Sequence, residues 1–124
     1  MDKIDWLPFI KAAVERNPVC FTDLNGMTIS EVYDTLQNFP DKSIYSGTRL
    51  ALPDEVWNFR RGDGIEKALL LAGYILLMDN SAIVSIEISN KKVLLSASDR
   101  IFHFTSYKKF NKSIQIKGRS YVIV

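Results

Sequence analysis

The stretch that decides the fold spans residues 63–88 and opens with Asp63-Gly64-Ile65-Glu66-Lys67-Ala68-Leu69-Leu70-Leu71-Ala72-Gly73-Tyr74-Ile75-Leu76-Leu77-Met78. This segment is apolar on nearly every side of a helix, which predicts one buried helix from Gly64 to Met78. Asp63 and Glu66 have the spacing of a capping box at its start. After Asp79-Asn80 the pattern changes to two-residue alternation, which is typical of half-buried strands. We therefore expect a buried helix packed on an antiparallel sheet of four or five strands that begins near Ala82.

Helices are also predicted upstream of this segment. The apolar stripe of Leu7, Ile10, Ala13 and Val14 predicts a helix from about Asp5 to Asn17, which ends before Pro18. Residues 28–31, Thr-Ile-Ser-Glu, form a second capping box and predict a helix from Ile29 to about Phe39. Residues 53–59 predict a short helical turn that starts with proline, after a loop at 42–51.

Downstream of the buried helix the alternation continues to the end of the chain. It predicts strands at residues 84–88, 92–97, 101–105, 113–117 and 121–124. In the third of these, Phe102 and Phe104 lie on one face, and Ile101, His103 and Thr105 lie on the other. Helices followed by strands indicate an α+β fold, in which N-terminal helices and the buried central helix pack on a C-terminal antiparallel sheet. We expect one domain over residues 1–124.

Composition sets the outer limits. The chain has 124 residues, of which 47% are hydrophobic, enough for one core. The apolar run at 68–78 is shorter than a bilayer span, and Pro8 and acidic residues near the N-terminus are unlike a secretory signal. Cytoplasmic location is therefore the default expectation. The single cysteine, Cys20, excludes an intrachain disulfide, and neither a metal nor a cofactor is predicted.

Charge is distributed unevenly along the chain. All 14 acidic residues lie between Asp2 and Asp99, so residues 1–99, with 10 basic side chains, sum to −4. The last 25 residues carry six basic side chains and no acid, and sum to +6. Such a split can mark an anionic partner, or it can reflect solvent-facing lysines that discourage edge pairing of strands.

The run from Leu52 to Ala72 resembles the nucleophile segment of the transglutaminase-like superfamily, which is related to papain-like cysteine proteases. That segment reads Arg-x-Gly-Asp-Cys, then one or two acidic residues, then Ala-Leu-Leu; here Arg60 to Leu70 read Arg-Arg-Gly-Asp-Gly-Ile-Glu-Lys-Ala-Leu-Leu. The resemblance covers about 20 residues closely and 82–106 loosely. It implies a cysteine at the start of a buried helix, facing a sheet that supplies a histidine and then an aspartate.

Two of those three catalytic positions are empty here. The nucleophile position falls on Gly64, the base position could fall on His103, and no acid follows Asp99. Since loss of one triad member costs orders of magnitude in rate, the resemblance implies no catalytic residues. Cys20 lies between Val19 and Phe21 and is expected to be a buried hydrophobe instead of a substitute nucleophile.

The resemblance therefore implies a non-catalytic domain that binds a protein, a peptide or a glycan. Its groove would be the vestigial active site, which contains Trp57, Asp63, Gly64 and His103. In this hypothesis Gly64→Cys is expected to fold and to recover a partly activated thiol.

Two alternatives remain open. One is a hydrolase or transferase with an atypical site around His103. The other is an anion or nucleic-acid binder that uses the basic C-terminal strands with Tyr107, Phe110 and Tyr121, because aromatic side chains interleaved with lysines can stack on bases.

Overall fold

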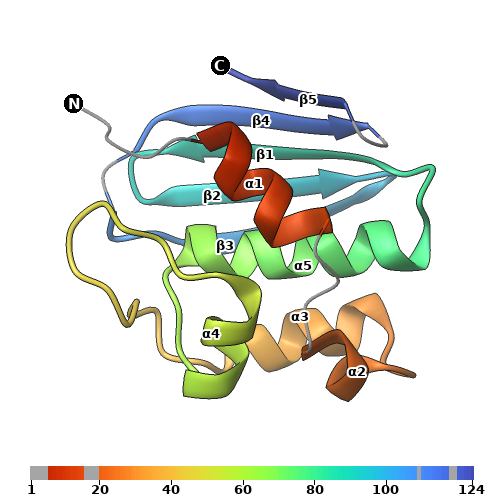
Figure 1. Cartoon of the computed structure of the whole chain (residues 1–124), viewed down its shortest axis with the longest axis horizontal. Helices are drawn as coiled ribbons and strands as arrows, with labels where there is room; N and C mark the ends of the chain where they lie inside the picture. The colour runs from red at the N-terminus through yellow and green to blue at the C-terminus, as the bar shows by residue number, and fades with distance from the viewer. Residues whose placement is uncertain (1–5, 16–19, 109, 118–119) are drawn as a thin grey trace.

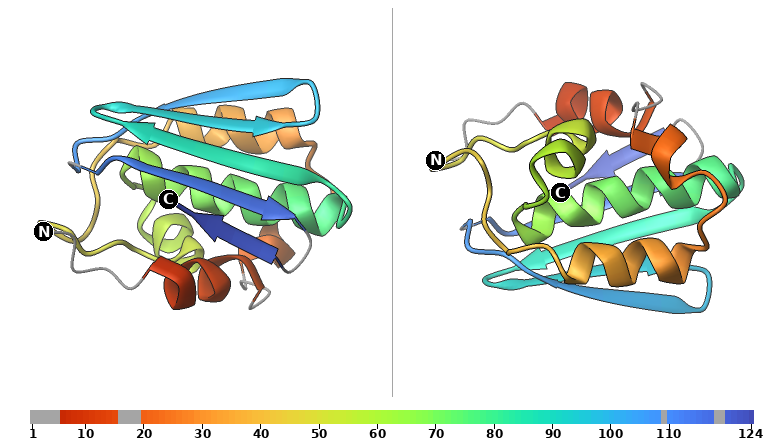
Figure 2. Two further views of the ribbon diagram at one scale, coloured as in Figure 1. Left: turned by 90° about the horizontal axis from the view of Figure 1, so that it is seen from above. Right: turned by 90° about the horizontal axis from the view of Figure 1, so that it is seen from below.

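The structure is a computed structural model that describes residues 6–15, 20–108, 110–117 and 120–124. Its helices are α1 (Trp6–Glu15), α2 (Cys20–Leu24), α3 (Ile29–Gln37), α4 (Pro53–Phe59) and α5 (Gly64–Met78). Its strands are β1 (Ile83–Ser89), β2 (Lys92–Ala97), β3 (Arg100–Thr105), β4 (Lys112–Lys117) and β5 (Ser120–Ile123). The helices gather on one face of the sheet and leave the other face uncovered (Figures 1 and 2). The predicted α+β class is confirmed.

The five strands form an antiparallel sheet in the order β3-β2-β1-β4-β5. Ile86 in the central strand pairs with Leu95 on one side and with Ile114 on the other. All three of these residues are buried. In β1, Ser85 and Glu87 lie on either side of Ile86 in sequence and face outward, as the alternation predicts. Asn90, in the β1–β2 turn, has a φ of 56°, a left-handed conformation that asparagine tolerates well.

Helix α5 lies at the centre of the helical layer, against β1, β2 and β3 and between α1, α3 and α4 (Figure 2). It is buried from Gly64 to Ile75, so its all-round apolar sequence reflects contacts on every side. The Tyr74 hydroxyl lies 2.5 Å from the carbonyl oxygen of Met27 and 3.0 Å from that of Leu24. The central helix is thus packed against the sheet on one side, and on the other side the Tyr74 hydroxyl binds it to residues 24 and 27 at the end of α2 and just after it.

The structure differs from the sequence prediction in three places. Leu7, expected on the buried stripe of α1, is 47% exposed, and Trp6 is buried in its place. Helix α3 ends at Gln37, not at Phe39, and the predicted ends of α1 at Asp5 and Asn17 lie outside the described residues. Helix α2 was not predicted: it has five residues, and its first N–H is bound by the carboxylate of Asp54, 34 residues away in α4.

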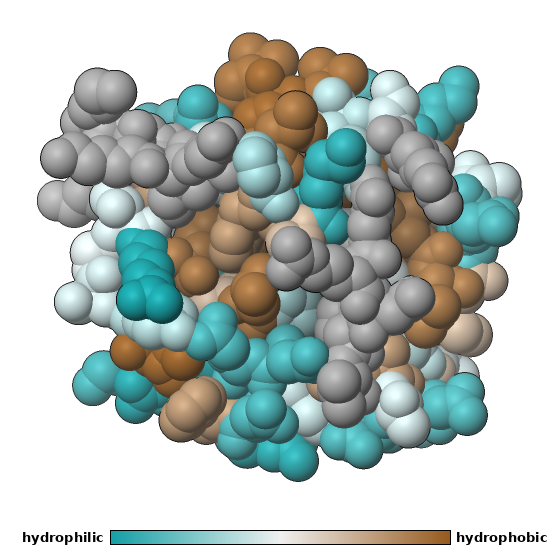
Figure 3. Space-filling view, viewed as in Figure 1, coloured by the Kyte–Doolittle hydropathy of each residue, from teal (hydrophilic) through white to brown (hydrophobic). Residues whose placement is uncertain are grey.

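The two edge strands of the sheet, β5 and β3, differ in how far they are covered. Apolar side chains gather at the top of Figure 3, over the end of the sheet formed by β5, where Val122 and Val124 are exposed. The opposite edge strand, β3, is closed by α3, because Tyr33 and Gln37 bind the backbone of His103. Within the described residues, no helix has the length and apolarity needed to cross a membrane.

Candidate functional site

The start of α5 is closed by the backbone of β3. A Cβ atom added to Gly64 would lie 2.3 Å from the carbonyl oxygen of Thr105 and 2.6 Å from its carbonyl carbon. Real Cβ contacts are essentially never shorter than 3.0 Å, so glycine is required here for close approach of two backbones. Position 64, which the sequence resemblance aligns with a nucleophile, therefore has no space for a side chain. This geometry corrects the expectation that a cysteine at position 64 would be accommodated as an activated thiol.

Asp63 caps α5 and also anchors the connection between β3 and β4. Its Oδ2 accepts hydrogen bonds from the Ile65 N–H at 3.0 Å and from the Ser106 hydroxyl at 2.6 Å. Its Oδ1 accepts from the Tyr107 N–H at 2.7 Å. Asp63 is buried and has three donors, so its carboxylate is committed to structure, as a helix cap should be.

Glu66 completes the capping box and binds the loop before α4. Its Oε1 accepts from the Asp63 N–H at 2.7 Å, and its Oε2 accepts from the Ala51 N–H at 2.5 Å and the Ser43 hydroxyl at 2.7 Å. Burial raises the pKa of this carboxyl group, and the hydrogen bonds from Ser43, Ala51 and Asp63 oppose that effect. Glu66 is thus a buried acid that joins three segments around the start of α5.

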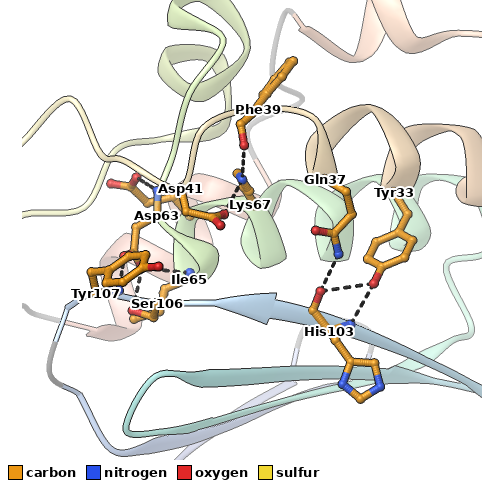
Figure 4. A network of polar contacts seen from close by, with 11 residues as sticks. Tyr33, Gln37, Phe39, Asp41, Asp63, Ile65, Lys67, His103, Ser106 and Tyr107 are labelled. Carbon is orange, nitrogen blue, oxygen red and sulfur yellow. Dashed lines mark hydrogen bonds and ion pairs between the residues drawn. The ribbon is translucent and has the colours of Figure 1, made fainter.

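Lys67 is a third buried charged side chain at the start of α5. Its Nζ donates to the Phe39 carbonyl oxygen at 2.7 Å and forms an ion pair with Asp41 at 2.5 Å (Figure 4). The Lys67 side chain is fully buried, whereas that of Asp41 is 41% exposed. Asp63, Glu66 and Lys67 therefore form a polar anchor that holds residues 39–51 and 106–107 against the helix start.

His103 points away from this anchor. It lies on the outer face of β3, since Phe102 and Phe104 occupy the inner face against the helices. Its backbone is held by Tyr33 and Gln37, and its imidazole ring extends to the other side of the strand (Figure 4). The structure does not bring His103 to Gly64.

Trp57, the remaining residue of the predicted groove, lies in the core. It is buried in α4, its Nε1 donates to the Asp23 carboxylate at 3.0 Å, and Arg60 lies 4.2 Å from its ring centroid. Phe39 packs beside it with ring centroids 5.9 Å apart. Among the four predicted residues, Asp63 and Gly64 are neighbours at the start of α5, and Trp57 and His103 serve other parts of the fold.

Cys20 is buried at the start of α2, 2% exposed. Burial raises the pKa of its thiol, and the neighbouring Asp54 carboxylate raises it further. A buried thiol with a raised pKa is a poor nucleophile, because the thiolate is the reactive form.

A pocket of about 850 Å³ lies beside the polar anchor; we call it the loop pocket. It is lined by residues 41–48 of the loop between α3 and α4, and by Arg61, Asp63, Tyr107 and Lys108. Lys108 is buried, and its Nζ donates to the carbonyl oxygens of Tyr45 at 3.0 Å and Gly47 at 2.7 Å. This lysine therefore joins the two walls of the pocket. Neither Cys20 nor His103 lines it, and the sequence contains no other cysteine or histidine.

A second pocket of about 660 Å³, the hairpin pocket, lies on the other side of Tyr107 and Lys108, which line both pockets. Its other walls are the β1–β2 turn at 89–92 and residues 110–111. The Ser106 N–H donates to the Lys91 carbonyl oxygen at 2.8 Å and holds the two walls together. Sequence reasoning named Asp63, Tyr107 and Phe110 but did not bring the pocket walls together, because they come from loops distant in sequence. Hydrogen bonds of Asp63, Lys108 and the Ser106 N–H join these loops.

Comparison with known proteins adds no assignment. No protein-family model matches the chain, and no curated protein or solved structure is significantly similar to it. Within the described residues, no group of three or more histidine, cysteine, aspartate or glutamate side chains is placed to hold a metal ion.

Proposed function

We propose that this chain is a non-catalytic, transglutaminase-like module of the cytoplasm that binds a protein, peptide or glycan ligand beside the start of α5. The observation that carries the proposal is the composition of the loop pocket, which contains neither the chain's cysteine nor its histidine. Acyl transfer through a thiol requires a cysteine with a base nearby. The loop pocket can instead offer hydroxyl groups, backbone groups, two tyrosines and cationic side chains to a ligand.

The polar anchor supports a binding role, because it makes the pocket walls rigid before a ligand arrives. Asp63 fixes Ser106 and Tyr107, Glu66 fixes Ser43 and Ala51, and Lys108 joins the walls. Pre-organised walls lower the entropy cost of binding. Asp63 thus remains part of the proposed site, whereas Trp57, Gly64 and His103 support the scaffold.

A screen of oligosaccharides and peptides by isothermal titration calorimetry tests the proposal. Ser46 is exposed and lines the loop pocket, so Ser46→Trp should fill the pocket and abolish binding of any ligand found. Ser120→Trp, at an exposed position on β5, is the matched control and should bind as the wild type does. Equal binding by both variants would place the ligand elsewhere. Turnover of ester or amide substrates that is lost in His103→Ala would favour the hydrolase alternative instead.

A further inference from the structure

We propose that the loop pocket and the hairpin pocket together form one groove for a carboxylate-bearing oligosaccharide, an inference that rests on the proposed binding function. We call this surface the Tyr107 groove, because Tyr107 lines both halves and is 62% exposed between them. Figure 4 shows this tyrosine beside Asp63 and Ser106, and the Asp63 carboxylate accepts a hydrogen bond from its backbone N–H. Its backbone is therefore held in place, and its exposed ring offers a platform on which a sugar ring can stack.

The charge of the groove favours an anionic ligand. Its basic residues are Lys42, Arg61, Lys91, Lys92 and Lys108, and its acidic residues are Asp41 and Asp63. Both acids are already engaged, Asp41 by Lys67 and Asp63 by its three donors. None of the five cations forms an ion pair with a carboxylate of the described residues. Hydrogen bonds from neutral donors do not cancel the Asp63 charge, and Lys108 interacts electrostatically with the buried Glu66 carboxylate. Five cations against the two carboxylates of the groove still leave it with a net positive charge.

Arg61 has the least satisfied side chain in the groove. Its Nη2 donates to the Ser43 carbonyl oxygen at 3.3 Å, while its Nε is buried without a hydrogen-bond partner, the one such side-chain atom among the described residues. A guanidinium group that is partly desolvated and not paired with an acid forms strong, charge-assisted hydrogen bonds when a carboxylate binds its remaining N–H groups. This arrangement points to a planar anionic group in the loop pocket.

The aromatic residues argue against single-stranded nucleic acid as the ligand. Phe110, a candidate for base stacking, is 4% exposed and packs edge-on against Trp6 with ring centroids 5.1 Å apart. Tyr121 is half-buried on β5. Successive bases require successive exposed rings, whereas one platform at Tyr107 suffices for one sugar.

The β3 edge of the sheet, which α3 covers, argues against strand addition by an extended peptide there. Such a peptide commonly binds by adding a strand to a sheet edge. Here the His103 carbonyl oxygen in the β3 edge is 2.6 Å from the Gln37 amide nitrogen and 3.1 Å from the Tyr33 hydroxyl. That part of the edge is therefore already occupied, and the groove offers side-chain contacts to its ligand.

Calorimetry with tetragalacturonic acid as the probe tests the inference. We expect binding that weakens as salt is added and that falls by about tenfold or more in Tyr107→Ala and in Arg61→Ala. Lys117→Ala is the matched control, because Lys117 is exposed at the far end of β4 from the groove, and it should bind within about twofold of the wild type. An equal loss in Lys117→Ala would overturn the inference, since it would indicate non-specific attraction to the basic C-terminal half.

Three further probes separate failure of this inference from failure of the proposed function. Methyl-esterified tetragalacturonate retains the sugar without its charge, tetraglutamate retains the charge without the sugar, and an oligothymidylate represents nucleic acid. If the ester or the peptide binds best and Tyr107→Ala abolishes that binding, the binding function stands and the acidic-sugar inference is wrong. Preferential binding of the oligothymidylate would support the nucleic-acid alternative. If no probe binds and the screen of oligosaccharides and peptides finds no ligand, both proposals fail.

Discussion

Replacement of Gly64 by alanine is the most direct test of the closed helix start. The added Cβ would lie 2.3 Å from the carbonyl oxygen of Thr105, so α5 and β3 would have to separate locally by roughly 0.7 Å to reach the shortest contact that real structures show. Because both atoms are fixed in secondary structure, the strain cannot be relieved by a side-chain rotation. Overpacking of this kind costs roughly 1–3 kcal/mol, and a contact with backbone should lie near the upper limit.

Alanine also recovers helix propensity, at most about 1 kcal/mol relative to glycine, since Gly64 is the first residue of the helix and not an interior one. We therefore expect Gly64→Ala to lower the free energy of unfolding by about 2 kcal/mol, measured by urea denaturation followed by circular dichroism. Gly73→Ala is the matched control in the same helix, because its Cβ would meet the ring end of Phe21 at 3.0 Å. This contact with a side chain can relax, so the control should remain within about 1 kcal/mol of the wild type. A Gly64→Ala protein as stable as the wild type would refute the reasoning.

Three further predictions concern the buried polar groups. Glu66→Gln should destabilise the fold by about 1–3 kcal/mol at neutral pH, since the amide cannot accept from all three present donors. Because burial raises the pKa of Glu66 in the folded state, the contribution of this group to stability should fall as pH rises above 4.5. The advantage of the wild type over Glu66→Gln should therefore be larger below that pH than at neutrality, and the opposite trend in urea melts would contradict this. Lys67→Met should cost about 1–3 kcal/mol in the same assay, because the Phe39 carbonyl oxygen loses its donor, and an unchanged midpoint would argue against this hydrogen bond. Native Cys20 should react with a thiol reagent only as fast as the protein opens, so rapid modification at neutral pH would be inconsistent with its burial.

Much of the fold follows from local patterns in the chain. The capping boxes at Thr28 and Asp63 are confirmed, and so are the helix from Gly64 to Met78 and the alternation of β1. The helix is buried only as far as Ile75, because Leu77 and Met78 in its last turn are exposed. These features depend on residues a few positions apart, which a sequence displays directly. Helix α2 was missed because its first N–H is bound by Asp54, which is distant in sequence.

The candidate site was less predictable, although one signal was present. Alternation in β3 places His103 opposite Phe102 and Phe104, so a core containing both phenylalanines turns the histidine away from α5. The Tyr107 groove had no such signal. Lys108 is one lysine in a basic segment, and only the tertiary structure shows that it is buried against the carbonyl oxygens of Tyr45 and Gly47.

The central claim is that ligand binds in the Tyr107 groove beside a closed helix start. Titration of nitrogen-15-labelled protein with tetragalacturonic acid, followed by amide chemical shifts, tests it most directly. The account predicts that the largest changes occur in residues 43–48 and 106–108, with little change at Ile101 and His103 on the outer face of β3. Largest changes on that outer face, with residues 43–48 unaffected, would contradict it.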